Sequence, residues 1–115
     1  MNNLTGETTR LRRQRIEQAI QLALESRWRE AAAVNRSIIS LFPSDVDAFN
    51  RLGKALMEMG EYEEARIAYQ KTLEMEPANS IARKNLGRLD IRAKLTNSGN
   101  AGAKKLDPAS FIAET

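Results

Sequence analysis

Four clustered carboxylates, Glu58, Glu61, Glu63 and Glu64, are the side chains in this chain most able to do acid–base chemistry. A carboxylate pair becomes catalytic when a buried pocket drives its two pKa values apart, and nothing in the surrounding sequence indicates such a pocket. The chain contains no His and no Cys, so it lacks the residues most used as general bases, thiol nucleophiles and zinc ligands. The sequence therefore predicts no catalytic site, no metal site and no cofactor, and a protein that is not an enzyme.

A weaker chemical signal lies near the C-terminus. A Gly-x-x-Gly sequence begins at Gly99 and is followed by two lysines, an arrangement that faintly resembles a phosphate-binding loop. Such a loop needs a preceding strand and a following helix, and the sequence indicates neither. We interpret residues 96–115 as a flexible linker and tail, in which Asp107-Pro108 is a start signal for a short helix.

The elements that would position any site are helices, and the clearest pair lies between residues 46 and 78. Apolar side chains recur at helical spacing from Val46 to Met59 and again from Tyr62 to Met75. Gly53 lies inside the first of these helices, where glycine costs roughly 1 kcal/mol relative to alanine. We expect this cost to be offset by a close approach of the two helices at Gly53, with the small Ala65 on the facing side. The boundaries are predicted from a cap at Ser44 or Asp45, a turn at Gly60 and a stop at Pro77.

Seven residues in this stretch stand at fixed spacings: Phe49, Leu52, Gly53, Leu56, Ala65, Tyr69 and Pro77. The pattern resembles the tetratricopeptide repeat, whose consensus runs aromatic-x-x-Leu-Gly-x-x-Tyr, then Ala-x-x-x-Phe, then Pro. Leu56 stands where the family usually has Tyr, which keeps the apolar character. The resemblance implies a helix–turn–helix unit and a scaffold that binds other proteins, and it does not name the partner.

A related pattern lies 34 residues upstream, which is the period of this repeat family. Pro43 corresponds to Pro77 and Ala31 to Ala65. In the first helix Arg15 and Gln18 replace the expected aromatic residue and Leu, so either the register slips there or an end unit carries polar residues where a central unit would bury apolar ones. Adding 34 to the central unit starts a third first-helix near residue 80, but no convincing second helix follows.

We therefore predict an all-α fold, a right-handed α-α superhelix of about two tetratricopeptide units plus a C-terminal capping helix. Because repeat proteins generally need about three units, we expect marginal stability or help from self-association. The expected organisation is a disordered lead (1–9), a repeat domain (10–95) with units at about 12–45 and 46–79 and a capping helix at about 80–95, and the linker and tail (96–115).

The resemblance also implies a place for the partner. In this family the concave groove is lined by fixed positions on the first helix of each unit. Cations there would suit an extended peptide or partner helix with acidic groups, or a terminal carboxylate, although the same charges could simply solvate a helix. The groove residues that match those positions are Asn50, Lys54, Met57, Ile81, Lys84, Arg88 and Ile91.

The composition and charge of the chain limit where it could be located and what it could bind. No apolar run is long enough to span a membrane, and no secretory signal is present, so we expect an intracellular, cytoplasmic protein without a membrane partner.

A cluster of four arginines between residues 10 and 15 could instead contact a nucleic-acid backbone. The net charge of +3 is mild, however, and the aromatic residues are not interleaved with the cations, so a protein partner is favoured. Weak homo-oligomerisation is the third interpretation.

Overall fold

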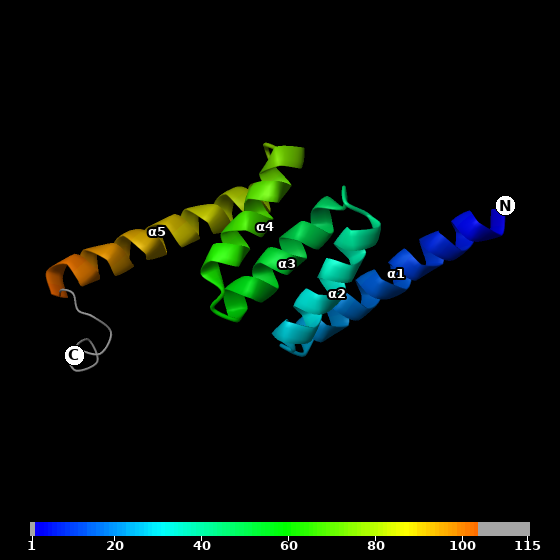
Figure 1. Cartoon of the computed structure of the whole chain (residues 1–115), viewed down its shortest axis with the longest axis horizontal. Helices are drawn as coiled ribbons and strands as arrows, with labels where there is room; N and C mark the ends of the chain where they lie inside the picture. The colour runs from blue at the N-terminus through cyan, green and yellow to red at the C-terminus, as the bar shows by residue number, and fades with distance from the viewer. Residues whose placement is uncertain (1, 104–115) are drawn as a thin grey trace.

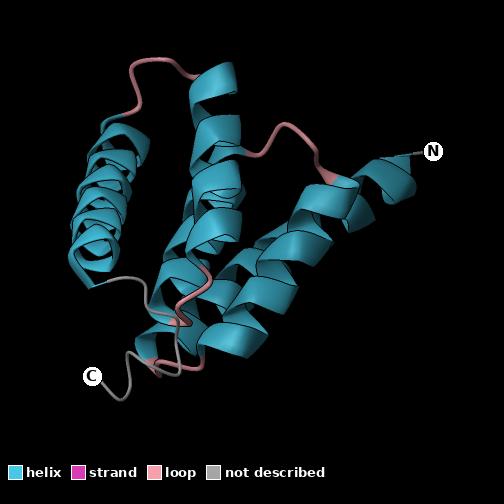
Figure 2. Cartoon of the chain, turned by 60° about the vertical axis from the view of Figure 1, so that its left-hand side comes forward, coloured by secondary structure: helices cyan, strands magenta, loops and turns pink. Residues whose placement is uncertain are grey.

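A computed structural model of the chain describes the backbone of residues 2–103 and the side chains of residues 6–96. Within that range it contains five α-helices and no strand (Figure 1). Each helix packs mainly against the helices before and after it, and α5 lies at one edge of the array (Figure 2). The prediction of an all-α helical-repeat fold is confirmed. The helices are α1 (Asn2–Leu24), α2 (Trp28–Leu41), α3 (Val46–Glu58), α4 (Tyr62–Met75) and α5 (Ser80–Ala103).

Both end helices are longer than the sequence predicted. α1 begins at Asn2, although residues 1–9 were expected to be a disordered lead, and α5 runs to Ala103 through the start of the expected linker. The physical reason is that extending a helix costs little once it is nucleated, since each Asn, Ser or Gly adds only about 0.5–1 kcal/mol relative to Ala. The short helix predicted after Asp107 lies outside the described residues.

The inner boundaries follow the predicted local signals. The Asp45 side chain caps α3 by accepting a hydrogen bond of 2.9 Å from the Ala48 amide. Gly60 ends the turn between α3 and α4 with φ of 80°, and Ser26 holds the equivalent turn between α1 and α2 with φ of 59°. Glycine adopts this left-handed backbone without strain, whereas serine does so at a cost.

The 34-residue register holds in α1. Ala19 and Leu22 are buried in the core at the positions that correspond to Gly53 and Leu56 of the central unit. The register therefore does not slip, and the half-buried Arg15 and exposed Gln18 are features of an end helix.

Gly53 allows an aromatic ring to pack directly on the α3 backbone. A Cβ atom added at Gly53 would lie 2.7 Å from Cζ of Tyr69, which is closer than real contacts allow. The nearest side chain to Gly53 is thus Tyr69, whereas the sequence suggested Ala65. In the first unit the corresponding residues are Ala19 and Asn35, so a larger residue on the first helix accompanies a smaller one on the second.

α5 attaches to the rest of the array along one face. Ala82 and Leu89 are buried, and the Ala82 amide donates to Oδ1 of Asn79 at 3.0 Å. Further along, Asp90 pairs with Arg66 of α4 at 2.6 Å. The residues of α5 on its other faces are exposed, and this exposure makes α5 the helix most open to a partner.

Candidate protein-interaction surface

The α3 part of the predicted groove is partly used within the fold. Asn50 is buried, and its amide nitrogen donates to Oδ1 of Asn79 at 3.2 Å. Because the same Asn79 oxygen accepts from the Ala82 amide, Asn50 ties α3 to the start of α5. The Asn50 oxygen has no hydrogen-bond partner within the described part of the chain.

Lys54 and Met57 also have neighbours in the fold. The Lys54 ammonium pairs with Glu58 at 2.8 Å, one turn further along α3, and lies 5.9 Å from the centre of the Trp28 ring. Met57 is half-buried against the hydrophobic core. The Lys54 cation is therefore balanced locally, and it contributes little free charge to the predicted groove.

The α5 part of the predicted groove is exposed to solvent. Ile81, Lys84, Arg88 and Ile91 are spaced by three or four residues, so they lie on one side of the helix, and all four are exposed. Ile81 is 54% exposed and Ile91 60%. Among the described residues neither Lys84 nor Arg88 has an ion-pair partner. This stripe combines apolar surface with two uncompensated cations.

The buried phenol of Tyr69 is influenced by charges on both α3 and α5. Burial raises the pKa of Tyr69 to about 12, with Arg88 of α5 opposing the rise and Glu58 of α3 adding to it. Charges from both helices therefore act on the phenol. Its oxygen has no hydrogen-bond partner in the described structure, a feature that the aromatic pattern of the sequence could not indicate.

A second polar contact was missed by the sequence interpretation. The Arg51 Nε donates to Oδ1 of the buried Asn35 at 2.9 Å and so joins α3 to α2. Burial lowers the pKa of the Arg51 guanidinium, while Asp45 and Asp47 favour its charged form. The 34-residue offset between Asn35 and Tyr69 was the available signal, since it places a polar side chain at a core position.

The N-terminal arginine cluster is not one continuous surface. Arg12 donates two hydrogen bonds to Asp45, at 2.9 and 3.1 Å, and lies 4.9 Å from the Phe42 ring centre. It therefore fixes α1 to the start of α3. Helical spacing turns Arg10 and Arg13 to a different side from Arg15. This dispersal leaves less basic surface for nucleic acid than the sequence suggested.

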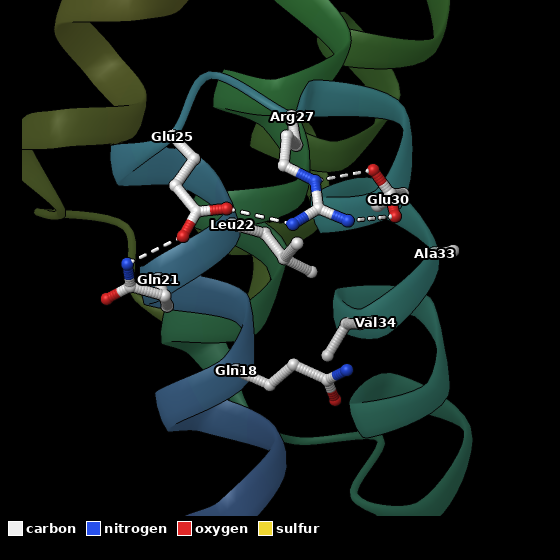
Figure 3. A pocket seen from close by; sticks show the side chains of 8 residues that line it. All are labelled: Gln18, Gln21, Leu22, Glu25, Arg27, Glu30, Ala33 and Val34. Atoms are coloured by element: carbon white, nitrogen blue, oxygen red, sulfur yellow. Dashed lines mark hydrogen bonds and ion pairs between the residues drawn. The ribbon is translucent and has the colours of Figure 1, made fainter.

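A cavity of about 500 Å³ lies between α1 and α2 (Figure 3). Arg27 pairs with Glu25 at 2.9 Å and with Glu30 at 2.7 Å, and the Gln21 amide donates to Glu25. The charged groups at the rim of the cavity are therefore paired with one another. The cavity is lined by Gln18, Gln21, Leu22, Glu25, Arg27, Glu30, Ala33 and Val34.

The described residues contain no group of three or more His, Cys, Asp or Glu side chains that could hold a metal ion. They also include no helix that is both long and apolar enough to cross a bilayer.

The stacked helical hairpins and the exposed face of α5 define the class of the chain, which is that of α-helical repeat scaffolds. Residues 46–79 match the family model described as tetratricopeptide repeat. The chain is also 41% identical, over 54 residues, to "Small glutamine-rich tetratricopeptide repeat-containing protein 2" of Mycosarcoma maydis. That alignment covers 47% of this chain and 15% of the relative. Residues 46–79 therefore match one tetratricopeptide repeat, the unit of domains that are generally protein-interaction modules.

Proposed function

We propose that this chain is a non-enzymatic adaptor that binds an acidic peptide or partner helix on its concave groove face. The repeat family supports a protein partner, and the stripe of Ile81, Lys84, Arg88 and Ile91 supports its chemistry. The single observation that carries the proposal is that Lys84 and Arg88 are exposed, one turn apart and without a carboxylate partner in the described structure. Apolar side chains on both sides of two such cations suit a ligand with carboxylates beside apolar anchors.

The test compares the wild type with the Lys84→Glu/Arg88→Glu variant in capture from cell extract, followed by direct binding of the captured protein. The variant should lose the partner while keeping its helical circular dichroism, because both side chains are exposed. Lys54→Glu is a poorer choice, since it would place two carboxylates one turn apart at Glu58.

The matched control is Arg10→Glu/Arg13→Glu, which changes the net charge equally at the other end of the array. Equal loss of capture in both variants would indicate nonspecific electrostatics and contradict the proposal. Nuclease treatment of the extract separates a protein partner from nucleic acid, and capture that disappears with nuclease would favour the latter.

A further inference from the structure

The contact between Gly53 and Tyr69 shows how one helix of this chain receives another. The Tyr69 ring of α4 occupies the space that a side chain at Gly53 would fill, with three ring atoms within 2.8 Å of the added Cβ. Tyr69 is completely buried there. Because Gly53 has no side chain, α3 leaves a space that an aromatic ring fills, and we call this space the seat.

Gly87 of α5 is the counterpart of Gly53, 34 residues further along the chain. A Cβ atom added at Gly87 meets no described atom within 4 Å. Gly87 is exposed, and α5 forms the edge of the array with no described helix beyond it (Figures 1 and 2). The equivalent seat on α5 is therefore open.

The charges around Gly87 specify what could cover it. Arg83, Gly87, Asp90 and Lys94 follow one another at spacings of four, three and four, so they form a stripe along one side of α5. Asp90 is already paired with Arg66. Neither Arg83 nor Lys94 has an ion-pair partner among the described residues, so the stripe is basic.

The end helices of a second copy of this chain do not fit that stripe. Residues 80–96 carry five cations and one carboxylate, and residues 2–24 carry four cations and two carboxylates. Both ends of the array are therefore basic and repel one another. By contrast, residues 61–76, which supply the ring seated on Gly53, carry five carboxylates and two cations.

We propose that the stripe of Arg83, Gly87, Asp90 and Lys94 docks an acidic helix of another protein, with an aromatic ring seated on Gly87 as Tyr69 is seated on Gly53. The partner's carboxylates pair with Arg83 and Lys94. This surface adjoins the groove stripe of Ile81, Lys84, Arg88 and Ile91, because Gly87 lies three residues after Lys84 and four before Ile91. Charge variants of each stripe therefore tell the two sites apart.

The experiment uses a fluorescent peptide of residues 61–76 as the probe and measures its anisotropy on titration with the full chain. The peptide should bind, and a Tyr69→Ala peptide and a scrambled peptide of the same charge should bind at least about tenfold more weakly. On the full chain, Gly87→Leu fills the seat and should weaken binding by a similar factor. Because the space at Gly87 is open and leucine is the better helix former, this variant should keep the wild-type circular dichroism and should melt no lower than the wild type.

Charge variants separate the stripe from general electrostatics and from the groove. Arg83→Glu/Lys94→Glu should weaken binding, whereas Arg10→Glu/Arg13→Glu, with the same change in net charge, should not. No binding of the wild-type peptide, or equal binding to Gly87→Leu, would overturn the inference. If binding survives Gly87→Leu but is lost in Lys84→Glu/Arg88→Glu, the peptide occupies the groove, and this inference fails while the proposed function stands.

Discussion

Gly53 and Gly87 occupy equivalent positions on α3 and α5, but only Gly53 is in contact with a ring. We expect Gly53→Ala to lower the free energy of unfolding by about 1–3 kcal/mol because the new methyl group must displace Tyr69. We expect Gly87→Ala to raise the free energy of unfolding by roughly 0.5–1 kcal/mol, since alanine is the better helix former and meets open space. Urea unfolding of the two variants measures both values. Similar effects at the two positions would contradict the assigned packing.

The phenol of Tyr69 should make stability fall at alkaline pH. Burial raises its pKa to about 12 in the folded chain, whereas the unfolded phenol titrates near 10. Above pH ~10 the unfolded state therefore holds fewer protons than the folded state, and stability declines until the folded phenol also ionises. The loss at pH ~11 should be roughly 1 kcal/mol relative to Tyr69→Phe, which has no phenol to ionise.

Unfolding of both proteins by urea between pH ~8 and ~11 tests this expectation. At neutral pH Tyr69→Phe should be at least as stable as the wild type, because the phenol oxygen has no described hydrogen-bond partner. Parallel pH profiles would show that Tyr69 is not the buried group inferred here.

At the level of single residues, the sequence predicted some contacts of the structure and missed others. The cost of a helix-interior glycine correctly indicated that Gly53 allows a close approach, because that argument needs only backbone propensity. It could not identify Tyr69 as the residue in contact, since ring orientation depends on tertiary packing. For the same reason the sequence assigned Asn50 to a groove, whereas its amide nitrogen bonds to Asn79.

At the scale of elements, Asp45 is the junction between α1 and α3. One carboxylate oxygen accepts from the Ala48 amide and the other accepts from Arg12. Asp45→Ala should lower the free energy of unfolding by about 1–2 kcal/mol through the lost cap alone. Asp45→Asn keeps an acceptor for the amide and should cost less. Thermal unfolding with Asp47→Ala as the control, expected to cost a few tenths of a kcal/mol, checks the order; equal costs for all three would contradict this role.

The helices themselves were predictable where the chain carries a stop signal. Asp45, Gly60 and Pro77 mark inner boundaries through capping, positive φ and ring geometry, which are local properties. The outer ends of α1 and α5 carry no strong stop, so helix propagation beyond the packed core decided them. Residues 2–9 and 96–103 are helical for this reason, and composition alone suggested otherwise.

At the scale of the whole molecule, charge is segregated along the array. Residues 25–79 carry ten carboxylates and seven cations, and both flanking segments are basic. The overall charge of +3 therefore conceals a basic–acidic–basic pattern along the array that composition could not reveal. The exposed cations of α5 then favour an acidic partner over a second copy, whose own end helices are basic.

This pattern makes a definite prediction about self-association, which the sequence had left open. At ~50 mM salt the chain should sediment at its monomer mass of 12.9 kDa over a roughly hundredfold range of concentration. Higher salt screens the repulsion between basic ends, so any contact through exposed Ile81 and Ile91 should appear at high salt first. Sedimentation equilibrium at low and high salt measures this. A dimer that forms at low salt and dissociates at high salt would contradict this prediction, because it would require attraction between opposite charges. In that case α5 of one copy would contact the acidic central segment of the other.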